Sequence, residues 1–115
     1  MRIKICCGNN TIADDVRVAD NFFSRLVGLL STPSMSDNQG LLIKRCRQVH
    51  CIGMRFAIDV VFINKENKIV AIESNLKPGH FSKYYSSAVN VLELNSGVSQ
   101  KFELCPDMSL SFMDI

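Results

Sequence analysis

A group of polar and sulfur-bearing side chains within ten residues of one another is the strongest candidate for chemistry in this sequence: His50, Met54, Arg55 and Asp59. Asp59 opens a stretch of aliphatic and aromatic residues, and a carboxylate removed from water must be paired, hydrogen-bonded or protonated. Arg25 and Arg55 are its candidate partners. Glu93 is a second carboxylate inside an apolar stretch, and it could share either arginine.

These charges allow two interpretations. A structural network of arginine and carboxylate side chains could hold a helix on a sheet, because such networks also place charges among apolar residues. Alternatively, the charges could form the floor of a pocket in which an arginine binds a carboxylate or phosphate through two hydrogen bonds. The predicted ligand is then a small polar molecule or a peptide segment, and the predicted binding residues are Arg25, His50, Met54, Arg55, Asp59 and Glu93.

A catalytic role would depend on His50, either as a general base near Asp59 or as the partner of a thiolate at Cys46. Cys46 lies four residues before His50, so the two side chains would share one face of a strand, whereas the adjacent Cys51 would point to the other face. The sequence contains no phosphate loop, dinucleotide-binding glycine motif or nucleophile elbow. A hydrogen-bonded structural histidine is the simpler interpretation, and no defined reaction is predicted.

The composition is that of a globular chain that forms one domain over residues 1–115, since 47% of the residues are hydrophobic and 21% are charged. The net charge of +2 gives no electrostatic argument for a nucleic-acid or membrane-surface partner. No apolar segment approaches the roughly 20 residues of a membrane span, and the first residues lack the apolar region of a secretory signal. We therefore expect a cytoplasmic protein that does not bind nucleic acid.

The five cysteines are an odd number, and Cys6 and Cys7 are adjacent. Adjacent cysteines fit alternate faces of a strand better than a disulfide framework. A zinc site normally has four ligands in paired short spacings, and only the pair Cys46 and His50 approaches this pattern. The sequence therefore predicts reduced thiols, no metal and no cofactor.

Hydrophobic periodicity predicts six to eight short strands, within residues 2–6, 16–18, 41–43, 49–54, 58–63, 69–72, 89–94 and 110–112. The segment 58–63 has apolar residues on both of its alternating faces, which is typical of a central strand that is covered on both sides. The segment 69–72 is also expected to be buried on both sides. A long loop at 75–87 places cations among aromatic residues. It is either a solvated loop or a lid over a ligand.

An amphipathic helix is predicted at 22–30, where Asp20 is a suitable N-cap and the apolar residues cover an arc of about 160°. Pro33 disfavours helical geometry in the residue before it and so ends this helix. A second, short helix is predicted at 98–103. Because the strands cluster as hairpins, the predicted fold class is α+β: a mostly antiparallel sheet curled into a partial barrel, with one packed amphipathic helix and one short helix.

Several segments together resemble the domain-of-unknown-function family 192, in the expected order over about residues 11–112: 19–30, 40–42, 49–50, 53–62, 75–78 and 88–97. Two positions depart from the family's pattern, since Ala57 replaces a usual proline and Pro106 a usual glycine. Both changes affect turns and remove no reactive group. The resemblance implies a small β-rich fold with one packed helix and no established activity, and some relatives carry export signals.

Three classes of function therefore stay open. The first is a binding or accessory module for a small polar ligand or peptide. The second is an enzyme that uses His50 with Cys46 or Asp59. The third is a subunit of a larger assembly, related to secretion or the envelope, that joins its partners through an exposed strand edge.

Overall fold

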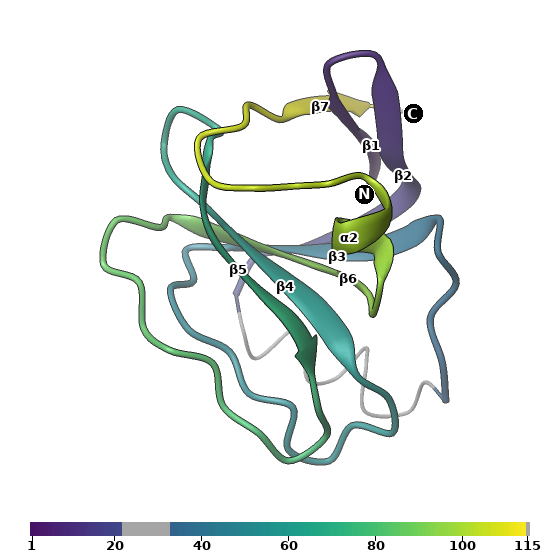
Figure 1. Ribbon diagram of the computed structural model, residues 1–115, viewed down its shortest axis with the longest axis vertical. Coiled ribbons are helices and arrows are strands. Elements are labelled where there is room, and N and C mark those ends of the chain that lie inside the picture. Colours follow the sequence, from purple (N-terminus) through teal and green to yellow (C-terminus); the bar gives the residue numbers. More distant parts are fainter. Residues whose placement is uncertain (22–32, 115) are drawn as a thin grey trace.

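One seven-stranded sheet forms the body of the protein in the computed structural model, which describes residues 1–21 and 33–114 (Figure 1). The order across the sheet is β5-β4-β6-β3-β2-β1-β7. Every neighbouring pair is antiparallel except β2 and β3, which are parallel. The strands are β1 (Arg2–Cys7), β2 (Asn10–Ala19), β3 (Gln39–Lys44), β4 (Ile58–Ile63), β5 (Ile69–Leu76), β6 (Asn90–Asn95) and β7 (Ser111–Asp114).

The predicted α+β fold class is wrong, because the described part of the chain is nearly all β. Its regular helix is limited to α2 (Val98–Lys101), which is the predicted short helix, and the predicted amphipathic helix at 22–30 lies outside the described residues. The sheet is open, with β5 and β7 as its two edges, rather than a partial barrel. Hairpin clustering indicates which strands pair, but it does not indicate whether the two edges of a sheet meet. Within the described ranges, no helix is long and apolar enough to cross a membrane.

The strand β4 is buried on both faces, as predicted for the segment 58–63, but it lies next to the edge strand β5 rather than at the centre of the sheet. All six residues of β4 are buried, and they alternate between two apolar clusters. We call the two sides of the sheet the loop face, which carries Leu41, Val60, Phe62 and Val91, and the helix face, which carries Leu42, Val61, Ile63, Leu92 and Leu94. The matching prediction for 69–72 is wrong: β5 is an edge strand, and positions 70–72 are only half-buried.

Two loops, 45–57 and 77–89, cover the loop face, and we refer to them as the paired loops. Backbone hydrogen bonds join them along their length: Cys51 N–H donates to the His80 carbonyl (2.8 Å), Ser82 N–H to Val49 (2.9 Å) and Tyr85 N–H to Arg47 (3.0 Å). The predicted long loop is thus held by its neighbour. In Figure 1 both loops lie at one end of the molecule, away from the β1–β2 hairpin.

The helix face is closed by α2 and by the chain that follows it. Val98 and Leu110 join the apolar cluster of this face. The following segment also pairs with the start of β5, because Ile69 N–H donates to the Met108 carbonyl (2.9 Å) and Asp107 N–H donates to the Ile69 carbonyl (2.8 Å). The sheet therefore has a different kind of cover on each side.

Candidate functional site

Asp59 lies on the helix face and holds α2 in place. Its carboxylate is 1% exposed. It accepts hydrogen bonds from the backbone N–H groups of Asn75 (2.9 Å), Gly97 (3.0 Å) and Ser99 (2.9 Å), and from the Ser99 hydroxyl (2.6 Å). Gly97 has a φ of 98°, a conformation that a residue with a side chain rarely adopts. The buried charge predicted at Asp59 is therefore stabilised by donors from β5 and α2.

Glu93 lies on the other side of the sheet. In β6 it is opposite Leu41 of β3 and Val60 of β4, both of which belong to the loop face. Asp59 is opposite Leu94, which belongs to the helix face. Directly opposite residues in neighbouring strands project to the same side, so the sheet separates the two carboxylates. One arginine therefore cannot bind both, and Arg25, one of the candidate partners, lies outside the described residues.

The other predicted site residues belong to the paired loops. Met54 is buried in the core of the loop face, whereas Arg55 is exposed. His50 is half-buried, its Nδ1 accepts a hydrogen bond from Ile52 N–H (3.2 Å), and its ring centroid lies 5.4 Å from that of Phe81. The Cys46 thiol donates to the Gln48 carbonyl (3.2 Å). The structure thus groups His50, Met54 and Arg55 on the loop side and places Asp59 on the far side of the sheet.

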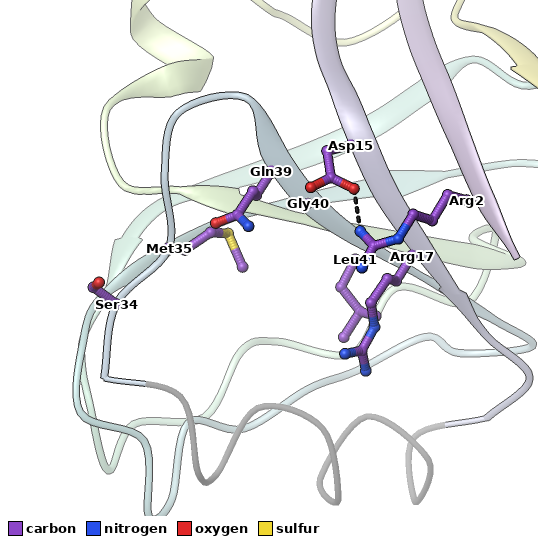
Figure 2. A pocket seen from close by; sticks show the side chains of 8 residues that line it. All are labelled: Arg2, Asp15, Arg17, Ser34, Met35, Gln39, Gly40 and Leu41. Carbon is purple, nitrogen blue, oxygen red and sulfur yellow. Dashed lines mark hydrogen bonds and ion pairs between the residues drawn. The ribbon is translucent and has the colours of Figure 1, made fainter. Parts of the chain in front are cut away.

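A cavity of about 120 Å³ lies elsewhere, at the end of the loop face formed by β1, β2 and β3 (Figure 2). Arg2, Arg17 and Asp15 stand on one side of it, with Leu41 beside Arg17, and Met35 lies across from them. On the opposite side are Ser34 and Gln39. We call it the arginine pocket, and its lining residues are Arg2, Asp15, Arg17, Ser34, Met35, Gln39, Gly40 and Leu41.

Two guanidinium groups share this pocket with one carboxylate. Arg2 of β1 is directly opposite Arg17 of β2, and like charges in such a position repel each other. Asp15 projects to the same face as Arg17, two residues earlier, and forms an ion pair with Arg2. Figure 2 shows the side chain of Arg17 extending away from Asp15 and past Leu41, its partner in β3. The pocket therefore carries an excess of positive charge at Arg17.

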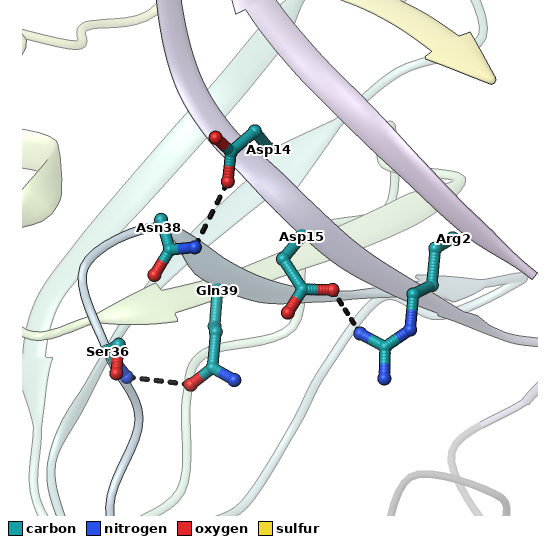
Figure 3. Close-up of polar contacts among 6 residues, drawn as sticks. All are labelled: Arg2, Asp14, Asp15, Ser36, Asn38 and Gln39. Carbon is teal, nitrogen blue, oxygen red and sulfur yellow. Dashed lines mark hydrogen bonds and ion pairs between the residues drawn. The ribbon is translucent and has the colours of Figure 1, made fainter. Parts of the chain in front are cut away.

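The rim of the pocket is held by short polar contacts (Figure 3). Ser36 N–H donates to Gln39 Oε1 (2.9 Å) on this rim, whereas the Asn38 side-chain amide donates to Asp14 Oδ1 (3.1 Å) outside the pocket, because Asp14 projects to the other side of β2. Because the oxygen of the Gln39 side chain accepts from Ser36, its amide nitrogen stays available as a donor across the pocket from the arginines. The arrangement offers donors from three strands to a negatively charged group.

The residue pattern does not predict this pocket, because the opposition of Arg2 and Arg17 depends on irregular strand pairing. The turn at Gly8 and Asn9 places Cys7 opposite Asn10, and a regular hairpin continued from there would place Arg2 opposite Asp15. Two register shifts within the hairpin move Arg2 opposite Arg17 instead. The hairpin was predicted, but a β-bulge leaves too weak a pattern in the sequence to be predicted from periodicity.

The protein is therefore an open-sheet β domain with a small, positively charged pocket. The chain belongs to the DUF192 family, described as an uncharacterized ACR, whose sequence profile matches residues 4–112. This finding confirms the resemblance to the domain-of-unknown-function family 192. No curated protein matches the sequence.

Two crystal structures have a similar fold. A protein of unknown function from Novosphingobium aromaticivorans DSM 12444 superposes with a TM-score of 0.82 at 14% identity, over 96% of this chain and 84% of that one. A candidate transcription regulator from Sinorhizobium meliloti 1021 superposes with a TM-score of 0.79 at 23% identity, over 96% of this chain and 92% of that one. At these identities the likeness concerns the fold.

Proposed function

We propose that this protein is a binding module for a small anionic ligand, which occupies the arginine pocket. The observation that carries the proposal is the direct opposition of Arg2 and Arg17, of which Arg2 pairs with the carboxylate of Asp15 while Arg17 extends away from it. Two adjacent guanidinium groups repel each other, so a bound anion stabilises the pair in addition to forming its own hydrogen bonds.

The chemistry of the pocket indicates a carboxylate or a phosphate. The planar guanidinium of Arg17 can donate two parallel hydrogen bonds to either group, while the Gln39 amide donates from the other side. Leu41 and Met35 add apolar side chains to the lining, which suits a short carbon chain. The volume of about 120 Å³ is well below the roughly 300–1,000 Å³ of pockets for drug-sized molecules, so the bound group has few atoms.

Isothermal titration calorimetry with inorganic phosphate and with succinate tests this proposal. We expect the wild-type protein to bind at least one of the two anions, and Arg17→Gln to bind it more weakly by about tenfold or more, because a charge-assisted hydrogen bond contributes about 1.5–3 kcal/mol. Arg55→Gln is the matched control, since Arg55 is another exposed arginine, in the loop 45–57 and not among the residues that line the pocket.

Two outcomes would overturn the proposal. One is the absence of binding of either anion to the wild-type protein at millimolar concentration. The other is an anion affinity that falls in Arg55→Gln and is unchanged in Arg17→Gln. That result would place the binding site in the paired loops, among the residues first predicted from the sequence. Thermal melting of each variant establishes that it is folded.

A further inference from the structure

The paired loops concentrate positive charge. They contain five of the thirteen Lys and Arg residues of the chain and none of its eleven Asp and Glu residues, so they carry a charge of +5 and the rest of the chain carries −3. All five cations are exposed: Arg45, Arg47, Arg55, Lys77 and Lys83. The small net charge of the whole chain therefore conceals a strongly basic end, and this end lies opposite the β1–β2 hairpin in Figure 1.

The same loops expose large apolar side chains. Phe81 and Tyr84 are each 61% exposed, and Ile52 is 48% exposed. Their chain neighbours Cys51, Ser82 and Tyr85 are turned toward the sheet: the first two are buried, and the ring of Tyr85 packs on Phe62 with centroids 4.3 Å apart. Ile52, Phe81 and Tyr84 therefore lie on the outer surface of the loops.

We propose that the paired loops dock the protein on an anionic lipid bilayer, with Ile52, Phe81 and Tyr84 entering the interface and the five cations contacting lipid phosphates. Lys and Arg near such a surface each add to the affinity, and aromatic rings favour the boundary between headgroups and acyl chains. Docking of this kind requires no membrane-spanning helix, because the protein lies on the bilayer.

The side chains on this surface favour lipid over a nucleic acid. A single strand of nucleic acid binds through rings on which bases stack, and an aliphatic side chain has no such ring. Ile52 would therefore add little to nucleic-acid binding, whereas burial in acyl chains suits it as well as it suits Phe81. The hydrogen bonds between the loops, such as the 2.8 Å bond from Cys51 N–H to the His80 carbonyl, also present these side chains on a fixed framework.

A single tryptophan provides a direct test, since the sequence contains none. We expect the fluorescence of Phe81→Trp to shift to shorter wavelength when vesicles of phosphatidylcholine with 30% phosphatidylglycerol are added at 0.1 M salt, and to be quenched by lipids brominated on their acyl chains. Met113→Trp is the matched control, because Met113 is 42% exposed on β7 at the other edge of the sheet. Its fluorescence should not change.

Co-sedimentation with the same vesicles separates the two contributions to docking. Lys77→Gln with Lys83→Gln should weaken binding by about 30-fold, because each cation near an anionic surface contributes about 1 kcal/mol. Lys65→Gln, in the exposed turn between β4 and β5, is the control and should bind as the wild type does. Binding should also fall as the salt concentration rises from 0.1 to 1 M, where screening shortens to about 3 Å.

Three results would overturn the inference: no binding of the wild-type protein to the anionic vesicles, equal binding to vesicles of phosphatidylcholine alone, or equal loss in Lys65→Gln. A nucleic-acid surface would show itself differently. The fluorescence of Phe81→Trp would then be quenched by a single-stranded oligonucleotide and would not shift with vesicles. None of these measurements depends on the arginine pocket, so either proposal can fail alone.

Discussion

On each face of the sheet, one carboxylate holds a covering segment in place, and the two carboxylates differ in how deeply they are buried. On the helix face, Asp59 is 1% exposed in the interior strand β4 and accepts four hydrogen bonds. On the loop face, Glu73 is half-buried in the edge strand β5 and accepts two, from Lys83 N–H (2.8 Å) and from the Tyr85 hydroxyl (2.9 Å). Asp59 fixes α2, and Glu73 fixes the loop 77–89.

This difference predicts unequal local stability. If α2 moved away from the sheet, the buried Asp59 carboxylate and its backbone N–H donors would lose their hydrogen bonds to each other. We therefore expect α2 to separate from the sheet only as the whole domain unfolds. The groups around Glu73 are closer to water, which replaces lost hydrogen bonds at lower cost. The loop 77–89 should therefore open locally while the sheet stays folded, as loops involved in binding often do.

Removal of the Asp59 carboxylate should have the largest effect. Asp59→Ala leaves the N–H groups of Asn75, Gly97 and Ser99 without their acceptor on the helix face. Each unsatisfied buried donor costs about 1–3 kcal/mol, so we expect the free energy of unfolding to fall by about 3 kcal/mol or more. Urea denaturation followed by circular dichroism measures this change.

Asp14→Ala is the matched control for that substitution. Asp14 is an exposed aspartate in β2 that accepts one hydrogen bond, from Asn38. Its loss should lower the free energy of unfolding by about 0.5 kcal/mol, as is usual for surface substitutions. Equal destabilisation by Asp59→Ala and Asp14→Ala would contradict the structural role given to Asp59.

Removal of the Glu73 carboxylate should have a smaller and more local effect. Glu73→Ala deletes the acceptor of Lys83 N–H and of the Tyr85 hydroxyl, and two partly exposed hydrogen bonds together contribute about 1–2 kcal/mol. Amide hydrogen exchange should become faster in the loop 77–89 and stay unchanged in β4 and β6. Glu66→Ala, in the exposed turn between β4 and β5, should alter neither quantity. Faster exchange throughout the sheet would show that the two faces unfold together.

The sequence predicted the buried parts of this fold better than its edges. The segment 58–63 has apolar residues on both faces, and it forms the strand β4, which is buried on both sides. The segment 69–72 has the same pattern, yet it lies at the edge in β5. Hydropathy indicates which residues avoid water. It does not give the order of the strands, nor whether the sheet is open or closed, because both depend on contacts between distant segments.

The candidate site was predicted less well, for a related reason. Asp59 and Glu93 were expected to converge because both are charges among apolar residues, but strand register places them on opposite faces. The basic surface of the paired loops was within reach of the sequence, since residues 45–57 and 77–89 contain no carboxylate. The net charge of the whole chain does not reveal this basic surface, because acidic residues elsewhere offset it. The net charge of each segment, counted separately, does reveal it.

The smallest expected effect is a pH dependence that arises on the loop face. Burial raises the pKa of Tyr85 above its ordinary value of 10.0, and the hydrogen bond and negative charge of Glu73 raise it further. The folded state thus favours the neutral phenol. Below about pH 10 this contribution to stability is complete. As the pH rises further, the unfolded chain releases the proton first, and the contribution is lost as the pH passes through the pKa of the folded state.

Tyr85→Phe isolates this contribution. At pH 7 the variant loses the hydrogen bond to Glu73, so its free energy of unfolding should fall by about 0.5–1.5 kcal/mol. Between pH 9 and pH 11 the stability of the wild-type protein should decline more steeply than that of the variant, because the variant has no phenol at this position. Urea denaturation across this range compares the two slopes. Parallel slopes would mean that Tyr85 is solvated in the folded protein, and that Glu73 does not hold the loop 77–89 on the sheet.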